Sequence, residues 1–330
     1  MARILVSDGM AKKAIERLKE IGFEVTEKHY SHEELSSGIL NNYDAIVVRS
    51  ATKLTEKVLS TIENEKGIRF IGRAGVGIDN INLEEASRRG ILVCNTPQSS
   101  TQSVVELTIG HLITSTRHIA TGDRKLRENN WAKKELRGTE LSGKNLGLIG
   151  YGRIAQGVSG VAKAFGMNIH CYDPYISKKF AKKDDCIIHK NIDDVFKNCT
   201  HISIHCNLNE ETYHLVNEER IEMMPEYGSD GMKCGRHIVN CARGGIVDEE
   251  SIIRTLKNGV LSSAALDVFE KEPLNLSLLL EQENFHGTPH IGASTIEAQS
   301  RIGDEMVILL KDFFNGERPV SYTHLTLPTI

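Results

Sequence analysis

The sequence has no strong excess of charge of either sign, no long apolar run and no repeated or low-complexity segment. Its formal net charge is −4 over 330 residues, which gives no electrostatic reason to expect nucleic acid or an anionic membrane surface as a partner. No stretch reaches the roughly 18 consecutive apolar residues of a membrane-spanning helix. The sequence therefore predicts neither a nucleic-acid-binding protein nor a membrane protein.

The sequence also lacks closely spaced pairs of cysteines. The seven cysteines include no C-x-x-C pair and no cysteine–histidine spacing typical of a metal site. Several of them lie in apolar, strand-like runs, which is typical of reduced thiols in a protein core. The first residues, MARILVSDG, predict a strand, and no apolar region typical of a signal peptide follows them. We therefore expect a cytoplasmic protein with no bound metal.

The most informative stretch is 146–173, in which an apolar run, a glycine turn, a helix and a second apolar run follow one another. Gly150 permits a tight turn, Gly152 lets the backbone approach a pyrophosphate, and Ala155 allows close packing of the helix on the strand. Asp173 ends the second apolar run, where a carboxylate accepts hydrogen bonds from ribose hydroxyls. This context indicates a dinucleotide-binding site. An ordinary βαβ unit with a glycine turn is the alternative.

Short apolar runs alternate with helical segments on both sides of this stretch. Before it, the runs that predict strands are 4–6, 23–26, 45–48, 69–71 and 91–94. After it, they are 202–205, 238–240 and 264–266. Regular alternation of strands and helices predicts the α/β class, with doubly wound parallel sheets.

Some segments lie outside this alternation. A long amphipathic helix is predicted over 104–119, and a polar helical stretch continues to Gly138. The loop 228–235, GSDGMKCG, interrupts the strand pattern and contributes no chemistry that its residues identify. Residues 321–330 follow a predicted helix over 302–314 and have no helical period, so we expect them to be disordered or not native.

Loops that follow predicted strands carry side chains suited to chemistry on a small acid. Arg243 lies in a glycine loop, Glu272 lies among other charges, and His290 lies beside proline and glycine. Ligands of doubly wound sheets bind at the carboxyl ends of the strands. There an arginine can bind a carboxylate and a histidine can move a proton. His205, at the end of another predicted strand, is the main alternative for the base, and each of these side chains also has an ordinary structural explanation.

A family resemblance rests on motifs along most of the chain. These motifs are 72–77 (GRAGVG) with 78–80 (IDN), 95–97 (NTP), 150–155, 172–174 (YDP), 240–250 (NCARGGIVDEE), 265–273 (ALDVFEKEP) and 288–295 (TPHIGAST). In this order they resemble the D-isomer-specific 2-hydroxyacid dehydrogenases over about residues 1–320. The resemblance implies a flavodoxin-like substrate domain formed by 1–99 and 291–330, and a Rossmann NAD-binding domain over 100–290. It implies an active site between the two domains.

The same resemblance implies roles for individual residues. Arg243, Glu272 and His290 are the implied catalytic residues. Substrate contacts are implied for Arg49, Ser50, Arg73, Gly75, Val76, Gly77 and Asn80, with the two arginines on a phosphate group. Contacts with NAD are implied for Val76, Gly150, Gly152, Arg153, Ile154, Asp173, Cys206, Cys241, Ala242, Asp267, His290 and Gly292. Cys206 stands where relatives often have a threonine, so a thiol replaces a hydroxyl at that contact.

The resemblance and the two arginines together imply NAD-dependent oxidation of 3-phospho-D-glycerate to 3-phosphooxypyruvate, the first step of the phosphorylated route to L-serine. A phosphorylated substrate needs guanidinium groups, whereas a lactate-like substrate does not. Glyoxylate or hydroxypyruvate reductases, D-lactate dehydrogenases and NAD-sensing corepressors share the motifs and are the alternatives. The resemblance also implies a homodimer through the long helix and the Trp131 segment. No C-terminal regulatory region is recognisable, so we expect no feedback inhibition by serine through one.

Overall fold

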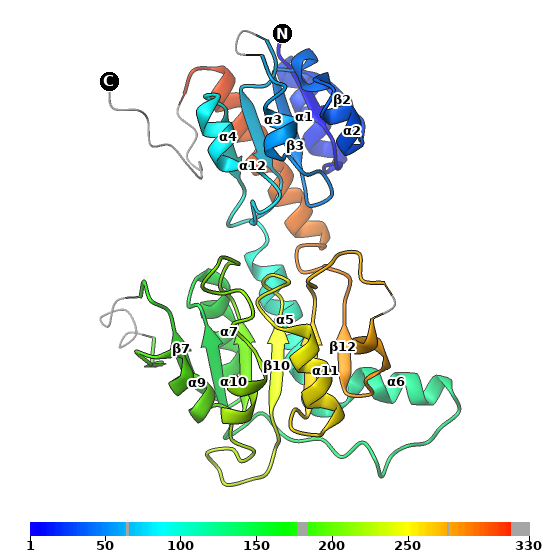
Figure 1. Cartoon of the computed structure of the whole chain (residues 1–330), viewed down its shortest axis with the longest axis vertical. Coiled ribbons are helices and arrows are strands. Elements are labelled where there is room, and N and C mark those ends of the chain that lie inside the picture. Colours follow the sequence, from blue (N-terminus) through cyan, green and yellow to red (C-terminus); the bar gives the residue numbers. More distant parts are fainter. Residues whose placement is uncertain (64–65, 177–183, 276, 318–330) are drawn as a thin grey trace. The chain divides into compact units, whose positions relative to one another are not determined.

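The computed structural model describes residues 1–63, 66–176, 184–275 and 277–317 (Figure 1). Our prediction for residues 321–330 lies outside the described residues. The chain divides into two units, Met1–Ser100 with Ala293–Ile330 and Thr101–Gly292. This division falls next to the predicted bounds, 1–99 with 291–330 and 100–290. One parallel sheet forms the centre of each unit.

The first unit has a five-stranded sheet in the order β2-β1-β3-β4-β5, and all neighbouring strands are parallel. Its strands are β1 (Arg3–Val6), β2 (Glu24–Glu27), β3 (Ala45–Val48), β4 (Phe70–Arg73) and β5 (Leu92–Asn95). This order is that of flavodoxin-like, doubly wound sheets. It confirms the predicted α/β class. β4 ends at Arg73, two residues beyond the predicted run 69–71, so Gly72 and Arg73 of the motif 72–77 belong to the strand.

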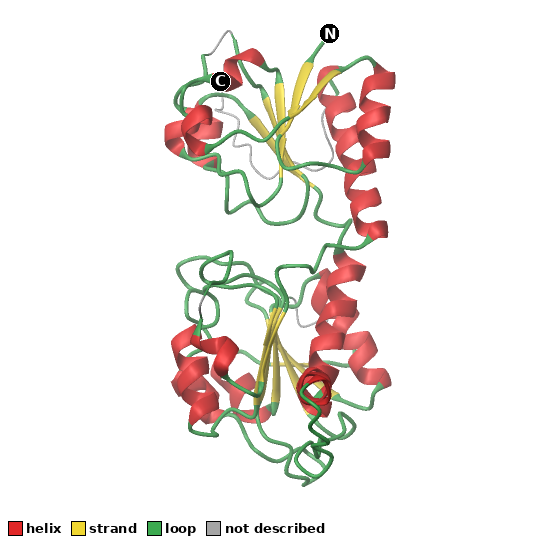
Figure 2. Cartoon of the chain, turned by 90° about the vertical axis from the view of Figure 1, so that its right-hand side faces the viewer, coloured by secondary structure: helices red, strands yellow, loops and turns green. Residues whose placement is uncertain are grey.

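Helices cover both faces of this sheet (Figure 2). They are α1 (Lys12–Ile21), α2 (His32–Leu35), the 3-10 helix η1 (Ile39–Asn42), α3 (Glu56–Leu59), α4 (Leu83–Arg88) and α12 (Ile296–Phe314). α1 and α12 pack on one face, and α2 to α4 close the other. α12 begins earlier than predicted because Thr295 caps it, accepting a hydrogen bond from the Ala298 amide.

The second unit has a seven-stranded sheet in the order β12-β11-β10-β9-β6-β7-β8, again with parallel neighbours throughout. Its strands are β6 (Asn145–Ile149), β7 (Asn168–Tyr172), β8 (Ile187–Ile188), β9 (His201–Ile204), β10 (His237–Asn240), β11 (Ser263–Leu266) and β12 (Phe285–Gly287). The chain crosses from one side of β6 to the other between β8 and β9. Because all neighbouring strands are parallel, the loops after β6, β7, β9, β10, β11 and β12 lie at one edge of the sheet. The crossing places the end of β9 beside the end of β6.

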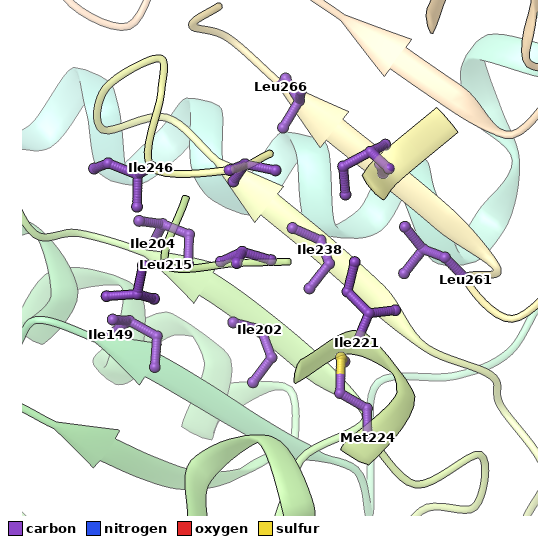
Figure 3. Close-up of a cluster of buried hydrophobic side chains, with 14 of the residues drawn as sticks. Ile149, Ile202, Ile204, Leu215, Ile221, Met224, Ile238, Ile246, Leu261 and Leu266 are labelled. Carbon is purple, nitrogen blue, oxygen red and sulfur yellow. The ribbon is translucent and has the colours of Figure 1, made fainter. Parts of the chain in front are cut away.

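Helices also lie on both faces of the second sheet. They are α5 (Thr101–Arg117), α6 (Ile119–Arg127), α7 (Arg153–Ala164), α9 (Ile192–Asn198), α10 (Glu218–Met223), α11 (Glu249–Lys257) and the 3-10 helix η2 (Leu278–Glu281). α5 and α7 pack on one face, while α9, α10 and α11 pack on the other. Figure 3 shows the buried cluster on the face that α9, α10 and α11 cover. In it, Ile202 of β9 and Ile238 of β10 lie with Ile221 of α10 and with Met224, which follows α10.

The predicted long helix and its polar continuation are wrong in extent. α5 ends at Arg117 and α6 begins at Ile119, because His118 between them has a left-handed backbone with φ of 53°. α6 ends at Arg127, and residues 128–138 form turns and irregular backbone rather than the predicted helix. Among the described residues, no helix combines the length and the apolar character needed to cross a membrane.

The glycine loop 228–235 is a short hairpin fixed to the start of β6. Tyr227 and Lys233 form an antiparallel bridge at its base. Nζ of the buried Lys144 lies 2.6 Å from Oδ2 of Asp230, and Oδ1 of Asp230 accepts a hydrogen bond from the Met232 amide at 3.0 Å. A buried ammonium group needs such a partner because desolvation of an unpaired charge is costly. The loop therefore has a structural role.

Candidate active site

The glycine turn after β6 packs directly against the end of β9. Gly150 has φ of 84°, a conformation that glycine adopts without a steric cost. A Cβ atom on Gly150 would lie 2.9 Å from the amide nitrogen of Cys206 and from the carbonyl carbon of His205. Any side chain would push these two strand ends apart. The turn therefore requires glycine for a conformational and for a steric reason.

Gly152 and the start of α7 form an open cradle. A Cβ atom on Gly152 would meet nothing within 4 Å. Arg153 begins the helix, and no side chain of the described residues caps this end. The first amides of a helix have no intrahelical acceptors and carry partial positive charge. The cradle therefore fits the pyrophosphate group of a dinucleotide.

Asp173 lies at the end of β7, beside the glycine turn. Its Oδ2 accepts a hydrogen bond from the Tyr151 amide at 2.8 Å, and its Oδ1 accepts one from the Tyr175 amide at 2.8 Å. Each carboxylate oxygen accepts more than one hydrogen bond. Asp173 is therefore oriented by the turn itself and still able to accept from a ribose hydroxyl.

Two predicted NAD contacts are cysteines that follow β9 and β10. Burial raises the pKa of Cys206 to about 11 and the pKa of Cys241 to about 12, so both thiols are protonated at neutral pH. Cys206 offers a weak S–H donor in place of a threonine hydroxyl. Two other predicted NAD contacts lie nearby in the sequence motifs. The Ala242 amide donates to Oδ1 of Asn240 at 2.9 Å. Ile154 lies in the first turn of α7.

Glu272 and His290 form a hydrogen-bonded pair. Nδ1 of His290 donates to Oε2 of Glu272 at 2.7 Å, since an ionised carboxylate only accepts. Nε2 of His290 is then the nitrogen that can face a substrate. Burial opposes the charge on Glu272, but the hydrogen bond and charge of His290, the Phe269 amide and the charge of Arg243 together hold its pKa below the usual value.

A buried carboxylate, Asp267, holds the loop that carries His290. Its Oδ1 accepts from the Thr288 hydroxyl at 2.6 Å and from the Ile291 amide at 2.8 Å. Its Oδ2 accepts from the Gly292 amide at 2.8 Å. His290 itself has φ of 53°, an unfavourable conformation that only its surroundings can maintain. Asp267 and Gly292, both predicted NAD contacts, thus bond to each other and fix the loop.

His111 of α5 extends this support. The Thr288 hydroxyl gives its proton to Asp267, so Thr288 accepts from Nε2 of His111 at 3.0 Å. Burial lowers the pKa of His111, although the Asp267 charge opposes this, and the imidazole is neutral at neutral pH. The sequence offered no signal for this role, because His111 lies within a helix far from the loop in the chain.

Arg243 lies in the loop after β10, and Asn240 shapes this loop. Nδ2 of Asn240 donates to the carbonyl of Arg243 at 2.8 Å. Nη1 of Arg243 donates to the carbonyl of Ala242 at 2.6 Å. Because β10, β11 and β12 are neighbours in the sheet, the loops bearing Arg243, Glu272 and His290 lie at one edge. The structure therefore brings the three predicted catalytic residues together.

His205 is less suited to the role of base. Burial lowers its pKa to about 3, and its Nε2 lies 3.0 Å from the Ser203 hydroxyl. A base with so low a pKa is weak, because proton transfer is efficient when the pKa lies near the working pH. His290 is better placed to act as the base, because Glu272 accepts from its Nδ1 at 2.7 Å and so orients the ring.

In the first unit, Arg49, Ser50 and Arg73 lie at the ends of two adjacent strands. The sheet register pairs Val48 of β3 with Arg73 of β4, and Arg49 and Ser50 follow Val48. Nη2 of Arg73 donates to the Ser50 hydroxyl at 3.0 Å. No ion pair is found for the Arg49 guanidinium within the described part of the chain. Two guanidinium groups thus lie at one sheet edge.

Asp8 and Asn80 hold the loop that carries Arg49. Asp8 accepts from the Arg49 amide at 2.7 Å, and from the amide and hydroxyl of Thr52 at 3.0 and 2.6 Å. Nδ2 of Asn80 donates to the carbonyls of Arg49 and Thr52 at 2.7 and 2.6 Å. Asn80, a predicted substrate contact, therefore shapes the loop. Asp8, which also follows a strand, is not among the site residues predicted from the sequence.

The predicted carboxylate-binding amides are not equally available. The Gly75 amide donates to the carbonyl of Arg73 at 2.8 Å. The amides of Val76 and Gly77 have no acceptor among the described residues. These two amides, rather than that of Gly75, are available to a substrate carboxylate.

Comparison with known proteins agrees with this arrangement. A family model described as the D-isomer specific 2-hydroxyacid dehydrogenase, NAD binding domain, matches residues 109–292. D-3-phosphoglycerate dehydrogenase of Methanocaldococcus jannaschii is 42% identical over 317 residues, which are 96% of this chain and 58% of that protein. The chain thus spans a little over half the length of such phosphoglycerate dehydrogenase relatives.

Two further similarities concern relatives of nearly the same length. Hydroxypyruvate reductase of Thermotoga maritima is 43% identical over 309 residues, covering 92% of this chain and 96% of that protein. The structure of D-lactate dehydrogenase of Aquifex aeolicus, complexed with NAD and lactic acid, has a TM-score of 0.82 at 28% identity. That similarity covers 97% of this chain and 98% of the other.

Proposed function

Because this chain belongs to the D-isomer-specific 2-hydroxyacid dehydrogenases, with an NAD-binding domain in its second unit, we propose that it oxidises 3-phospho-D-glycerate to 3-phosphooxypyruvate. One observation carries the choice of substrate. Arg49 and Arg73 end adjacent strands, and the Ser50 hydroxyl lies with them. A phosphate group with several acceptor oxygens suits two guanidinium groups and a hydroxyl.

The first unit supplies the contacts that select the substrate. Arg49 and Arg73 bind the phosphate group, and the amides of Val76 and Gly77 bind the carboxylate. Asp8 keeps the Arg49 loop in place through the backbone and carries no substrate contact. The proposal requires both units to meet one substrate, and the predicted active site between them stays a prediction.

The second unit supplies the chemistry. The open turn at Gly152 and the Asp173 carboxylate would hold NAD, which would supply the hydride acceptor for C2 of the substrate. Nε2 of His290 takes the proton of the C2 hydroxyl, and the Glu272 carboxylate on Nδ1 stabilises the imidazolium that forms. Arg243 holds the carboxylate and the developing carbonyl of the substrate in register. Asp267 keeps His290 in its strained conformation without entering the reaction.

Reduction of hydroxypyruvate is a second candidate function. It is favoured by the Thermotoga maritima relative, because the match covers 96% of that protein. The same residues serve this reaction in the opposite direction, with His290 giving its proton to the carbonyl oxygen. The two candidate substrates differ in the phosphate group, so they should differ in how much Arg49 and Arg73 contribute to substrate binding.

A steady-state assay of NADH absorbance tests the proposal. The purified chain is supplied with NAD and 3-phospho-D-glycerate, and separately with NADH and hydroxypyruvate or glyoxylate. Arg49→Ala and Arg73→Ala should each raise KM for 3-phospho-D-glycerate about tenfold or more, since a charged hydrogen bond is worth about 1.5–3 kcal/mol. Arg17→Ala, which removes an exposed arginine paired with Asp304, is the matched control and should leave KM unchanged.

The results distinguish the candidates. Equal losses with phosphorylated and unphosphorylated substrates would show that the arginines are structural. A wild-type chain that reduces hydroxypyruvate and is inactive on 3-phospho-D-glycerate would overturn the proposed substrate in favour of the second candidate. A homodimeric, cytoplasmic enzyme stays a prediction, and light scattering of the purified chain tests the dimer.

A further inference from the structure

A segment that the proposed function does not use runs beside the Arg243 loop. The amide of His214 donates to the carbonyl of Gly245 at 2.8 Å, and the amide of Val216 donates to that of Ile246 at 3.0 Å. Val216 and Val247 form an isolated parallel bridge. The backbone at His214 is therefore hydrogen-bonded to the chain that follows Arg243 directly.

The side chain of His214 reaches a different loop. Its Nε2 lies 3.0 Å from Oε1 of Glu270, two residues before Glu272 in the chain. Its ring stacks on Tyr213 with centroids 4.0 Å apart. His214 has φ of 49°, a left-handed conformation that is unfavourable for a histidine and persists only when its surroundings hold it. One residue thus bonds to two loops, with its backbone on one and its imidazole on the other.

Glu270 is held from a second side as well. Its Oε1 accepts from the Glu249 amide at 3.1 Å, and its own amide donates to Oε1 of Glu249 at 2.7 Å. Asp248 also lies close. One ring nitrogen of His214 and one carboxylate oxygen from each of Asp248 and Glu270 all lie within 4.8 Å of one another. Several carboxylates therefore surround His214, and a donor at this point offsets their repulsion.

The two loops are also in direct contact. A Cβ atom on Gly244 would lie 1.8 Å from the carbonyl oxygen of Phe269 and 2.8 Å from the amide nitrogen of Glu270. Gly244 follows Arg243, and the Phe269 amide donates to Oε1 of Glu272 at 3.1 Å. Phe269 thus contacts Gly244 through its carbonyl and Glu272 through its amide, which links the positions of the two loops.

We propose that His214 is a positioning residue that fastens the Arg243 loop to the Glu272 loop, so that Arg243 and the Glu272–His290 pair keep the spacing that hydride and proton transfer require. His214 touches neither substrate nor NAD in this role. It acts through Gly245 on one side and Glu270 on the other. The inference rests on the proposed function, because it assigns His214 to the same reaction.

The test removes the imidazole and keeps the backbone. Asparagine tolerates the left-handed conformation, and its shorter side chain does not reach Glu270. His214→Asn should lower kcat roughly ten- to hundredfold, since small misplacements of catalytic groups cost about this much. Its KM for NAD, its dissociation constant for NAD and its thermal midpoint should change little. Glu270→Gln should keep kcat within about threefold, because the amide oxygen still accepts from His214 and Glu249.

A matched control and a double variant sharpen the result. His118→Asn replaces another left-handed histidine, with φ of 53°, at the junction of α5 and α6, and should leave kcat unchanged. If His214 acts through Glu270, then His214→Asn combined with Glu270→Ala should lose no more than the larger single loss.

The outcomes separate the two proposals. The enzyme is assayed with whichever of 3-phospho-D-glycerate or hydroxypyruvate the wild type turns over. Wild-type activity with unchanged kcat in His214→Asn would overturn the positioning role alone. Losses that multiply in the double variant, or a fall in NAD affinity that parallels the fall in kcat, would also overturn it. An inactive wild type would instead overturn the proposed function.

Discussion

Replacing Asp267 by asparagine tests how the fold holds the proposed base. The carboxylate of Asp267 is buried and accepts three hydrogen bonds from the loop around His290, from Thr288, Ile291 and Gly292. Asparagine has nearly the same shape, so no cavity forms. It keeps one oxygen and replaces the other by a donor group.

The structure predicts where the mismatch falls. In the better orientation, the asparagine oxygen keeps the bonds from Thr288 and Ile291, and its NH₂ group faces the amide of Gly292. Loss of a hydrogen bond to a charged group costs about 1.5–3 kcal/mol, and an unsatisfied buried donor costs about 1–3 kcal/mol. We expect the free energy of unfolding to fall by about 3–5 kcal/mol in total. Because His290 is left-handed and depends on this loop, kcat should fall about a hundredfold.

Urea unfolding followed by circular dichroism measures the first quantity, and NADH absorbance measures the second. Asp123→Asn is the matched control, since Asp123 is exposed on α6 and pairs with Arg127 four residues along the helix. An exposed pair of this kind contributes little to stability. An Asp267→Asn chain with full kcat and stability within about 0.5 kcal/mol of the wild type would refute the reasoning.

Three further predictions follow from other parts of the structure. Gly244→Ala should abolish turnover but not NAD binding, because its Cβ would lie 1.8 Å from the carbonyl oxygen of Phe269; kcat within twofold of the wild type would contradict this. Burial lowers the pKa of His237 to about 4, against roughly 6.5 in the unfolded chain, so the unfolded state binds more protons between these values. The stability that this histidine contributes is complete above pH about 6.5 and is lost as the pH falls through about 4. A urea midpoint that does not change with pH over this range would argue against this contribution of His237. Asp173→Ala should weaken NAD binding about tenfold and leave NADP affinity unchanged or higher, as measured by fluorescence titration; equal losses for the two would remove the ribose role.

Short-range features of this chain are predictable from sequence because near neighbours determine them. The glycine turn at Gly150 and Gly152 can be recognised because an apolar run precedes it and a helical period follows. The same holds for the strand ends before Arg243, Glu272 and His290, which the structure places after β10, β11 and β12. The extent of α5 and α6 was not predictable, because the break at His118 depends on a backbone conformation that no local motif encodes.

Only the tertiary structure decides which of these ends meet. The strand order brings β10, β11 and β12 together, so that Nδ1 of His290 reaches Glu272. It leaves His205 partly buried against the glycine turn, with its pKa lowered to about 3, which makes it a weak base. It also gives Asp267, His111 and His214 supporting roles, because contacts between residues far apart in the chain depend on packing that no local sequence pattern records.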